Sequence, residues 1–86
     1  MDKQQAISEF FKVVADLDAG LELEVSDATL EKDVERLHDA DEALAPLLSS
    51  ADAETYDEAR AALHDVLTRL KEERNLDFGN VDLVAA

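Results

Sequence analysis

The segment 26–48, SDATLEKDVERLHDADEALAPLL, predicts the central helix of this protein and decides its fold. Its apolar residues recur in alternating steps of four and three, provided that Asp41 fills the one gap in the series. Such a series forms a coiled-coil-like seam, here with one acidic interruption. The apolar residues of this seam are Leu30, Val34, Leu37, Leu44 and Leu48.

Both ends of this helix carry local signals. Ser26 or Asp27 suits the N-cap, since a short oxygen-bearing side chain can accept a hydrogen bond from a free N–H of the first turn. Pro46 ends or kinks the helix, because proline has no N–H and restricts the residue before it. We therefore predict a helix over 27–48 that is interrupted at Pro46.

The preceding residues predict a first helix over 5–18 and a connector over 21–25. The apolar residues of this helix share one face, and Gly20 follows as a left-handed stop. The connector alternates apolar and acidic residues, so we expect an extended segment that covers one end of the bundle. The apolar face holds Ile7, Phe10, Phe11, Val14 and Leu17.

A third helix is predicted over 52–74. Ser50 or Asp52 can cap its start, and Asn75 can stop it. Two cations in its last turn, Lys71 and Arg74, suit the negative end of the helix dipole. Its buried stripe consists of Tyr56, Ala59, Leu63, Val66, Leu67 and Leu70.

Three helices with short connectors predict an all-α fold, a small up-down-up three-helix bundle. A chain of 86 residues makes one domain, and we place the bundle at 1–75. Residues 76–86 form a short apolar C-terminal tail, which either docks on the bundle or binds a partner. No apolar run approaches the roughly 18 residues of a membrane span. We expect a soluble protein that is cytoplasmic by default and makes no contact with a membrane.

The charge of the chain restricts its partners. Twenty-two acidic residues oppose eight basic ones, which gives a net charge of -14. Nucleic acid and anionic membranes would repel such a protein, so we expect no direct binding to either and favour a basic protein partner. A salt-adapted proteome would show the same bias, and the sequence leaves both explanations open.

Asp41 interrupts the seam of the central helix. A carboxylate at a core position is costly unless it is paired. Arg60 lies at a comparable distance beyond the turn between the second and third helices. We predict an Asp41–Arg60 ion pair that fixes the register of this hairpin.

The sequence predicts no catalytic, cofactor-binding or metal-binding residues. Glycine occurs only at 20 and 79, so no phosphate-cradling loop is present. Glu35 and His38 have the Glu-x-x-His spacing of carboxylate-bridged metal bundles, but the other helices lack a matching set. Residues 62–67, ALHDVL, resemble the phosphoacceptor box of one histidine-kinase subfamily, although here the box lies on the last helix instead of the first.

Two functions remain. The first is a non-catalytic, small acidic protein-interaction or regulatory module that binds a protein partner, or a second copy of itself, through apolar residues. The candidates for this contact are Phe11, Leu47, Phe78 and Leu83.

The alternative is an acidic inhibitor of the phage anti-defence, antitoxin or immunity type. It would block a basic nucleic-acid-binding site by imitating a row of phosphates. A merely solvated acidic face would have the same sequence pattern. The carboxylates at helical spacing are Glu31, Glu35, Asp39 and Glu42.

Overall fold

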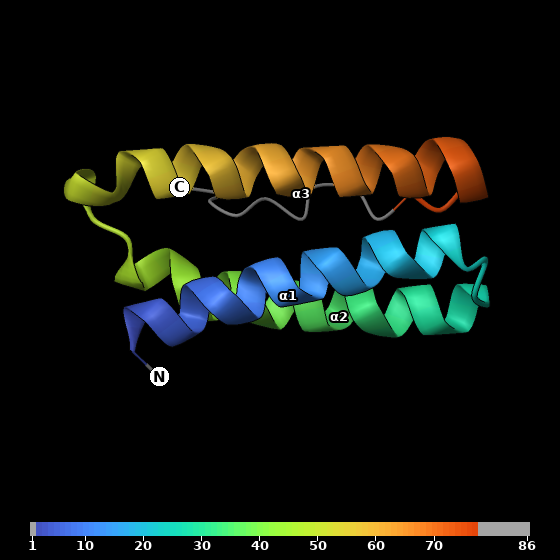
Figure 1. Cartoon of the computed structure of the whole chain (residues 1–86), viewed down its shortest axis with the longest axis horizontal. Helices are drawn as coiled ribbons and strands as arrows, with labels where there is room; N and C mark the ends of the chain where they lie inside the picture. The colour runs from blue at the N-terminus through green and yellow to red at the C-terminus, as the bar shows by residue number, and fades with distance from the viewer. Residues whose placement is uncertain (1, 78–86) are drawn as a thin grey trace.

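The computed structural model describes residues 2–77 and shows three long helices packed together (Figure 1). These helices are α1 (Lys3–Glu22), α2 (Asp27–Leu44) and α3 (Ala53–Arg74). Two short 3-10 turns, η1 (Ala45–Leu47) and η2 (Ser50–Asp52), join α2 to α3. The described residues contain no strand, so the predicted all-helical fold is confirmed for this part of the chain. None of its helices is long and apolar enough to cross a membrane.

The first helix is longer than predicted at both ends. Asp2 caps it, since its carboxylate accepts a hydrogen bond from the Gln5 N–H at 2.8 Å and Gln5 Oε1 accepts one from the Asp2 N–H at 3.3 Å. The helix then continues through Gly20 to Glu22. The predicted stop at Gly20 and the predicted extended connector over 21–25 are therefore wrong.

Gly20 serves close packing inside the helix. Its α-carbon is buried, and a Cβ at this position would lie 3.1 Å from Val25 Cγ2 and 3.2 Å from Leu30 Cδ2. The missing side chain thus lets the chain after the turn pack tightly on α1. Leu21 is buried in the core and continues the helix, because a lone extended segment would leave its backbone groups without a pairing strand.

Helix α1 ends at Glu22, and the backbone of Glu24, two residues later, closes its last turn. Glu24 has a left-handed backbone with φ 54°. Its N–H donates to the Leu21 carbonyl at 3.3 Å, and the Val25 N–H donates to the Gly20 carbonyl at 3.1 Å. These two bonds form a Schellman motif, which glycine usually closes. A glutamate occupies that position here.

The second helix starts where it was predicted to start but ends earlier than residue 48. Ser26 is the N-cap, since its hydroxyl accepts a hydrogen bond from the Thr29 N–H at 3.3 Å. The helix ends at Leu44, and Pro46 lies in the 3-10 turn that follows. Of the two effects predicted for Pro46, the structure shows that the helix ends rather than kinks and continues to residue 48, because Pro46 cannot donate the next helical hydrogen bond.

The third helix agrees with its prediction to within one residue. It begins at Ala53 and ends at Arg74, and Asn75 caps it in a left-handed conformation with φ 56°. The Asn75 N–H donates to the Lys71 carbonyl at 3.0 Å, which closes the last turn. Asp52 precedes the helix but makes no side-chain capping bond to it. Its carboxylate binds the connector instead.

Helix α1 lies against both other helices, and its buried face supplies the middle of the core (Figure 1). The predicted seam of α2 is buried as expected, except for Leu48, which lies beyond the helix and is half-buried. Phe10 is fully buried, whereas Phe11 packs edge-on against it with ring centroids 5.4 Å apart. The core consists of Ala6, Phe10, Val13, Val14, Leu17, Leu21, Leu30, Val34, Leu37, Leu44, Ala59, Leu63, Val66 and Leu70.

Candidate partner-binding surfaces

Cations on α2 and α3 tie the helices together. Arg69 of α3 reaches α1, with Nη1 2.9 Å from Asp18 Oδ1 and Nη2 3.2 Å from Glu22 Oε1. Its Nε also lies 2.8 Å from Glu73 Oε2 on α3. This hydrogen bond to Glu73 is the main cause of a raised Arg69 pKa, and the two α1 carboxylates add to it.

Arg74 and Arg36 make comparable ties. Arg74 donates to the Val25 carbonyl at 2.8 Å and pairs with Asp27 at 2.6 Å, so the end of α3 is held to the α1–α2 turn. Arg36 of α2 contacts Asp33 at 3.0 Å and Asp16 of α1 at 3.2 Å. Its pKa is raised, chiefly by the hydrogen bond to Asp33. These three arginines thus lie between packed elements and join them.

The acidic row of α2, defined as Glu31, Glu35, Asp39 and Glu42, is exposed along its whole length. At 3.6 residues per turn, the four side chains fall within an arc of about 80° and span about 17 Å of helix. Glu42 lies 3.1 Å from His38 Nε2. The other three carboxylates make no ion pair within residues 2–77.

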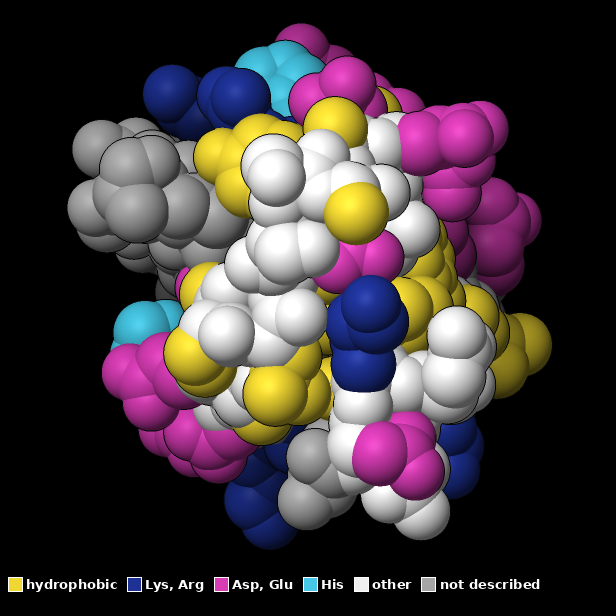
Figure 2. Space-filling view, turned by 90° about the vertical axis from the view of Figure 1, so that its left-hand side faces the viewer, with side chains coloured by type: hydrophobic (Ala, Val, Ile, Leu, Met, Phe, Trp, Pro, Cys, Tyr) yellow, Lys and Arg dark blue, Asp and Glu magenta, His cyan; other side chains and the backbone are white. Residues whose placement is uncertain are grey.

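Exposed acids also occur on α3. Five of them make no ion pair with any residue of the described chain, so the acidity is not confined to one helix. Figure 2 shows Asp and Glu side chains on several sides of one end of the bundle. The acids of α3 that lack an ion pair in this part of the protein are Glu54, Asp57, Glu58, Asp65 and Glu72.

The predicted apolar contact residues are only partly described. Leu47 is 36% exposed, and Phe11 is half-buried against the core. Hydrophobic side chains gather at the end of the bundle that carries η1 and η2 (Figure 2). We call the Leu47–Leu48 pair at this end the apolar corner. Phe78 and Leu83, with most of the predicted tail over 76–86, lie outside the described residues.

Sequence reasoning missed two features. Leu23 is the most exposed large apolar side chain of the described residues, at 76%, and lies in the α1–α2 turn. The second is the carboxylate of Asp52, which joins Ser49 and Lys3 at the other end of the bundle. The Ser49-x-x-Asp52 spacing of a capping box was the available signal for this contact.

The structure places the predicted polar pair in contrasting surroundings. Asp41 is buried on α2, as its place in the seam predicts. Arg60 is exposed on α3, and its guanidinium carbon lies 5.6 Å from the centroid of the Tyr56 ring. The Asp41–Arg60 ion pair itself stays a prediction.

The histidines and the acids around them form no metal-ligand cluster in residues 2–77. His38 and His64 are both exposed. A hollow of about 420 Å³ lies at the start of α1, and its described lining is polar side chains of that helix, Asp2, Gln4, Gln5, Ser8 and Glu9. Comparison of the chain with protein-family models, with curated proteins and with solved structures finds no match.

Proposed function

We propose that this protein is a non-catalytic acidic interaction module that binds a basic protein partner through the acidic row of α2. The observation that carries the proposal is that most cations of the chain are held in ion pairs, whereas most carboxylates of the α2 row are not. Within residues 2–77, five of the eight cations of the chain are held in ion pairs with carboxylates, and most of these pairs join separate elements. Three carboxylates of the row, by contrast, face solvent and make no ion pair in this described part of the chain.

Such a row attracts a cationic surface over the Debye screening length, which is about 10 Å at 0.1 M ionic strength. Its carboxylates are held on a helix whose opposite side is buried, so they keep their spacing when the partner binds. Preorganised charge favours rapid and selective encounter with a complementary surface. The proposal includes an up-down-up order of the helices, supported by the short connectors, and a cytoplasmic location, supported by the lack of cysteine.

A second candidate function uses the same row. An inhibitor that occupies a nucleic-acid-binding site would present carboxylates in place of phosphates and would compete with nucleic acid for its partner. The exposed side chains of Glu31, Glu35 and Asp39 at successive turns favour this alternative. The occurrence of further exposed acids on α3 supports the broader role of an acidic module.

The test is capture of partners from an extract on the immobilised protein, followed by elution in steps of increasing salt and mass spectrometry. A triple variant, Glu31→Gln/Glu35→Gln/Asp39→Asn, removes three charges from the row. We expect its partner to elute at distinctly lower salt. Competition with duplex DNA or RNA then separates the candidates, because only the inhibitor releases its partner to nucleic acid.

A matched control removes the same three charges from α3, as Asp57→Asn/Glu58→Gln/Asp65→Asn. These carboxylates are also exposed and make no ion pair within the described residues. The partner should elute from the control variant at the same salt concentration as from the wild type. Equal losses in both triple variants would show that net charge alone attracts the protein, and the proposed role of the α2 row would be rejected.

A further inference from the structure

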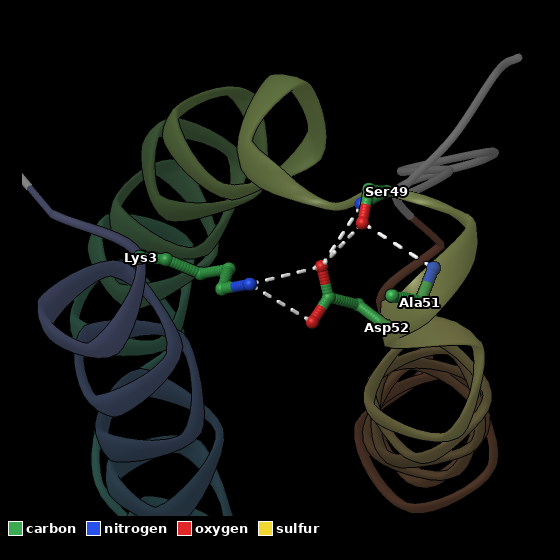
Figure 3. Close-up of polar contacts among 4 residues, drawn as sticks. All are labelled: Lys3, Ser49, Ala51 and Asp52. Carbon is green, nitrogen blue, oxygen red and sulfur yellow. Dashed lines mark hydrogen bonds and ion pairs between the residues drawn. The ribbon is translucent and has the colours of Figure 1, made fainter.

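A single carboxylate closes the connector between α2 and α3 (Figure 3). Asp52 Oδ2 accepts hydrogen bonds from the Ser49 N–H at 3.0 Å and from the Ser49 hydroxyl at 3.1 Å. Lys3 Nζ lies 3.0 Å and 3.1 Å from the two oxygens of the same carboxylate. Lys3 belongs to the first turn of α1. We call these three residues the Asp52 clamp, because they join α1, the connector and the start of α3.

The start of α3 has few other attachments. None of the side chains over 53–58 is buried, and the first buried residue of the helix is Ala59. Tyr56 is half-buried, and its ring contacts Arg60 of the same helix. By contrast, the later turns bury Leu63, Val66 and Leu70.

The far end of α3 is also tied more firmly to the other elements. Arg69 contacts two carboxylates of α1, and Arg74 binds the α1–α2 turn through Val25 and Asp27. Segments with few buried apolar contacts open at low free energy, while the rest of a domain stays folded. The connector before α3 is not helical throughout, since Leu48 and Ser49 have extended backbones between two 3-10 turns.

We infer that α3 opens locally from its N-terminal end and that the Asp52 clamp holds this end closed. In this opening the first turns of α3 unwind, the connector at Leu48 and Ser49 takes up the movement, and the arginine-tied end of α3 stays in place. It enlarges the apolar surface next to Leu47, which is already partly exposed. The clamp thereby controls how much apolar surface this end of the bundle offers, which is a property separate from charge-driven binding to α2.

Amide hydrogen exchange of the full chain under native conditions tests this inference without a partner. In the wild type, amides over 57–62 should exchange faster than amides over 66–72. Asp52→Asn should accelerate exchange over 57–62 about tenfold, because it removes the charged partner of Lys3 and Ser49. Amides of α1, α2 and 66–72 should change less than about twofold.

Two further variants make the result decisive. Lys3→Gln breaks the clamp from α1 and leaves the Ser49–Asp52 bonds in place, so it should accelerate the same amides even if Asp52→Asn does not fold. Asp57→Asn is the matched control, because Asp57 is exposed and makes no ion pair within residues 2–77. Uniform exchange along α3 in the wild type, or equal acceleration by Asp57→Asn, would overturn the inference.

Discussion

Arg69 Nη1 lies 2.9 Å from Asp18 Oδ1, which links the last third of α3 to the last turns of α1 across 51 positions of sequence. The same guanidinium contacts Glu22 and Glu73, so one cation bridges three carboxylates. In a chain with a net charge of -14, such a contact both attracts two helices and reduces the repulsion between their acids.

Arg69→Gln should therefore destabilise the bundle more than removal of an exposed cation that makes no ion pair in the described part of the chain. The variant leaves Asp18, Glu22 and Glu73 close together without their shared cation. We expect a melting temperature roughly 5 °C lower in dilute buffer, as followed by circular dichroism. Lys32→Gln is the control, since it removes the same charge from an exposed side chain of α2 that makes no ion pair within residues 2–77. Equal melting temperatures of the two variants would contradict this interpretation.

The Asp52 clamp should lose its effect in acid. Hydrogen bonds from Ser49, and then from Lys3, hold the pKa of Asp52 below its ordinary value. A carboxyl group with a lowered folded-state pKa stabilises the fold above its unfolded pKa, about 3.9 for aspartate, and this contribution disappears as pH falls through the folded value. Urea unfolding should show wild type more stable than Asp52→Asn at neutral pH, with the two converging in acid. A constant difference down to the lowest pH would refute the prediction.

Glu24→Gly should stabilise the protein. Glu24 holds a left-handed backbone that costs a residue with a side chain about 1 kcal/mol relative to glycine. Denaturant unfolding should show a gain of about 0.5–1 kcal/mol. The same substitution inside α2, Glu31→Gly, should instead cost about 1 kcal/mol. Since both variants remove one exposed negative charge, a gain in both would mean that charge and not backbone conformation is responsible.

Leu37→Ala should be among the most damaging single substitutions. Leu37 of α2 is fully buried in the core. Its truncation leaves a cavity and lowers the free energy of unfolding by about 2–5 kcal/mol. Leu47→Ala removes the same atoms from the apolar corner, where the side chain is 36% exposed. It should cost less than about 1 kcal/mol. Chemical denaturation measures the free energy of unfolding of both variants. Similar losses of stability would mean that Leu47 belongs to the core.

Added salt should raise the stability of the whole bundle. Many carboxylates of α2 and α3 are exposed without an ion pair in the described chain, so their mutual repulsion outweighs the few cation ties that salt also weakens. The melting temperature should increase between dilute buffer and about 1 M sodium chloride. An unchanged or lower value would remove salt adaptation as an explanation of the acidity.

Local and periodic signals predicted much of this fold. The steps of four and three in α2 placed Leu30, Val34 and Leu37 in the core, because a helix brings such positions to one face. Ser26 and Asn75 act as the helix start and stop that their side chains favour. These features depend only on residues within a few positions of one another.

The predictions that proved wrong concern positions where contacts with residues distant in the sequence determine the local structure. Gly20 read alone is a helix stop, yet the space beside it is taken by Val25 and Leu30 after the turn, and the helix continues to Glu22. The acidic row of α2 was visible from spacing alone. The sequence by itself thus determined which faces are apolar and which acidic. The tertiary structure alone decided which charges meet, because contacts such as Lys3–Asp52 join side chains that become neighbours only when the helices pack.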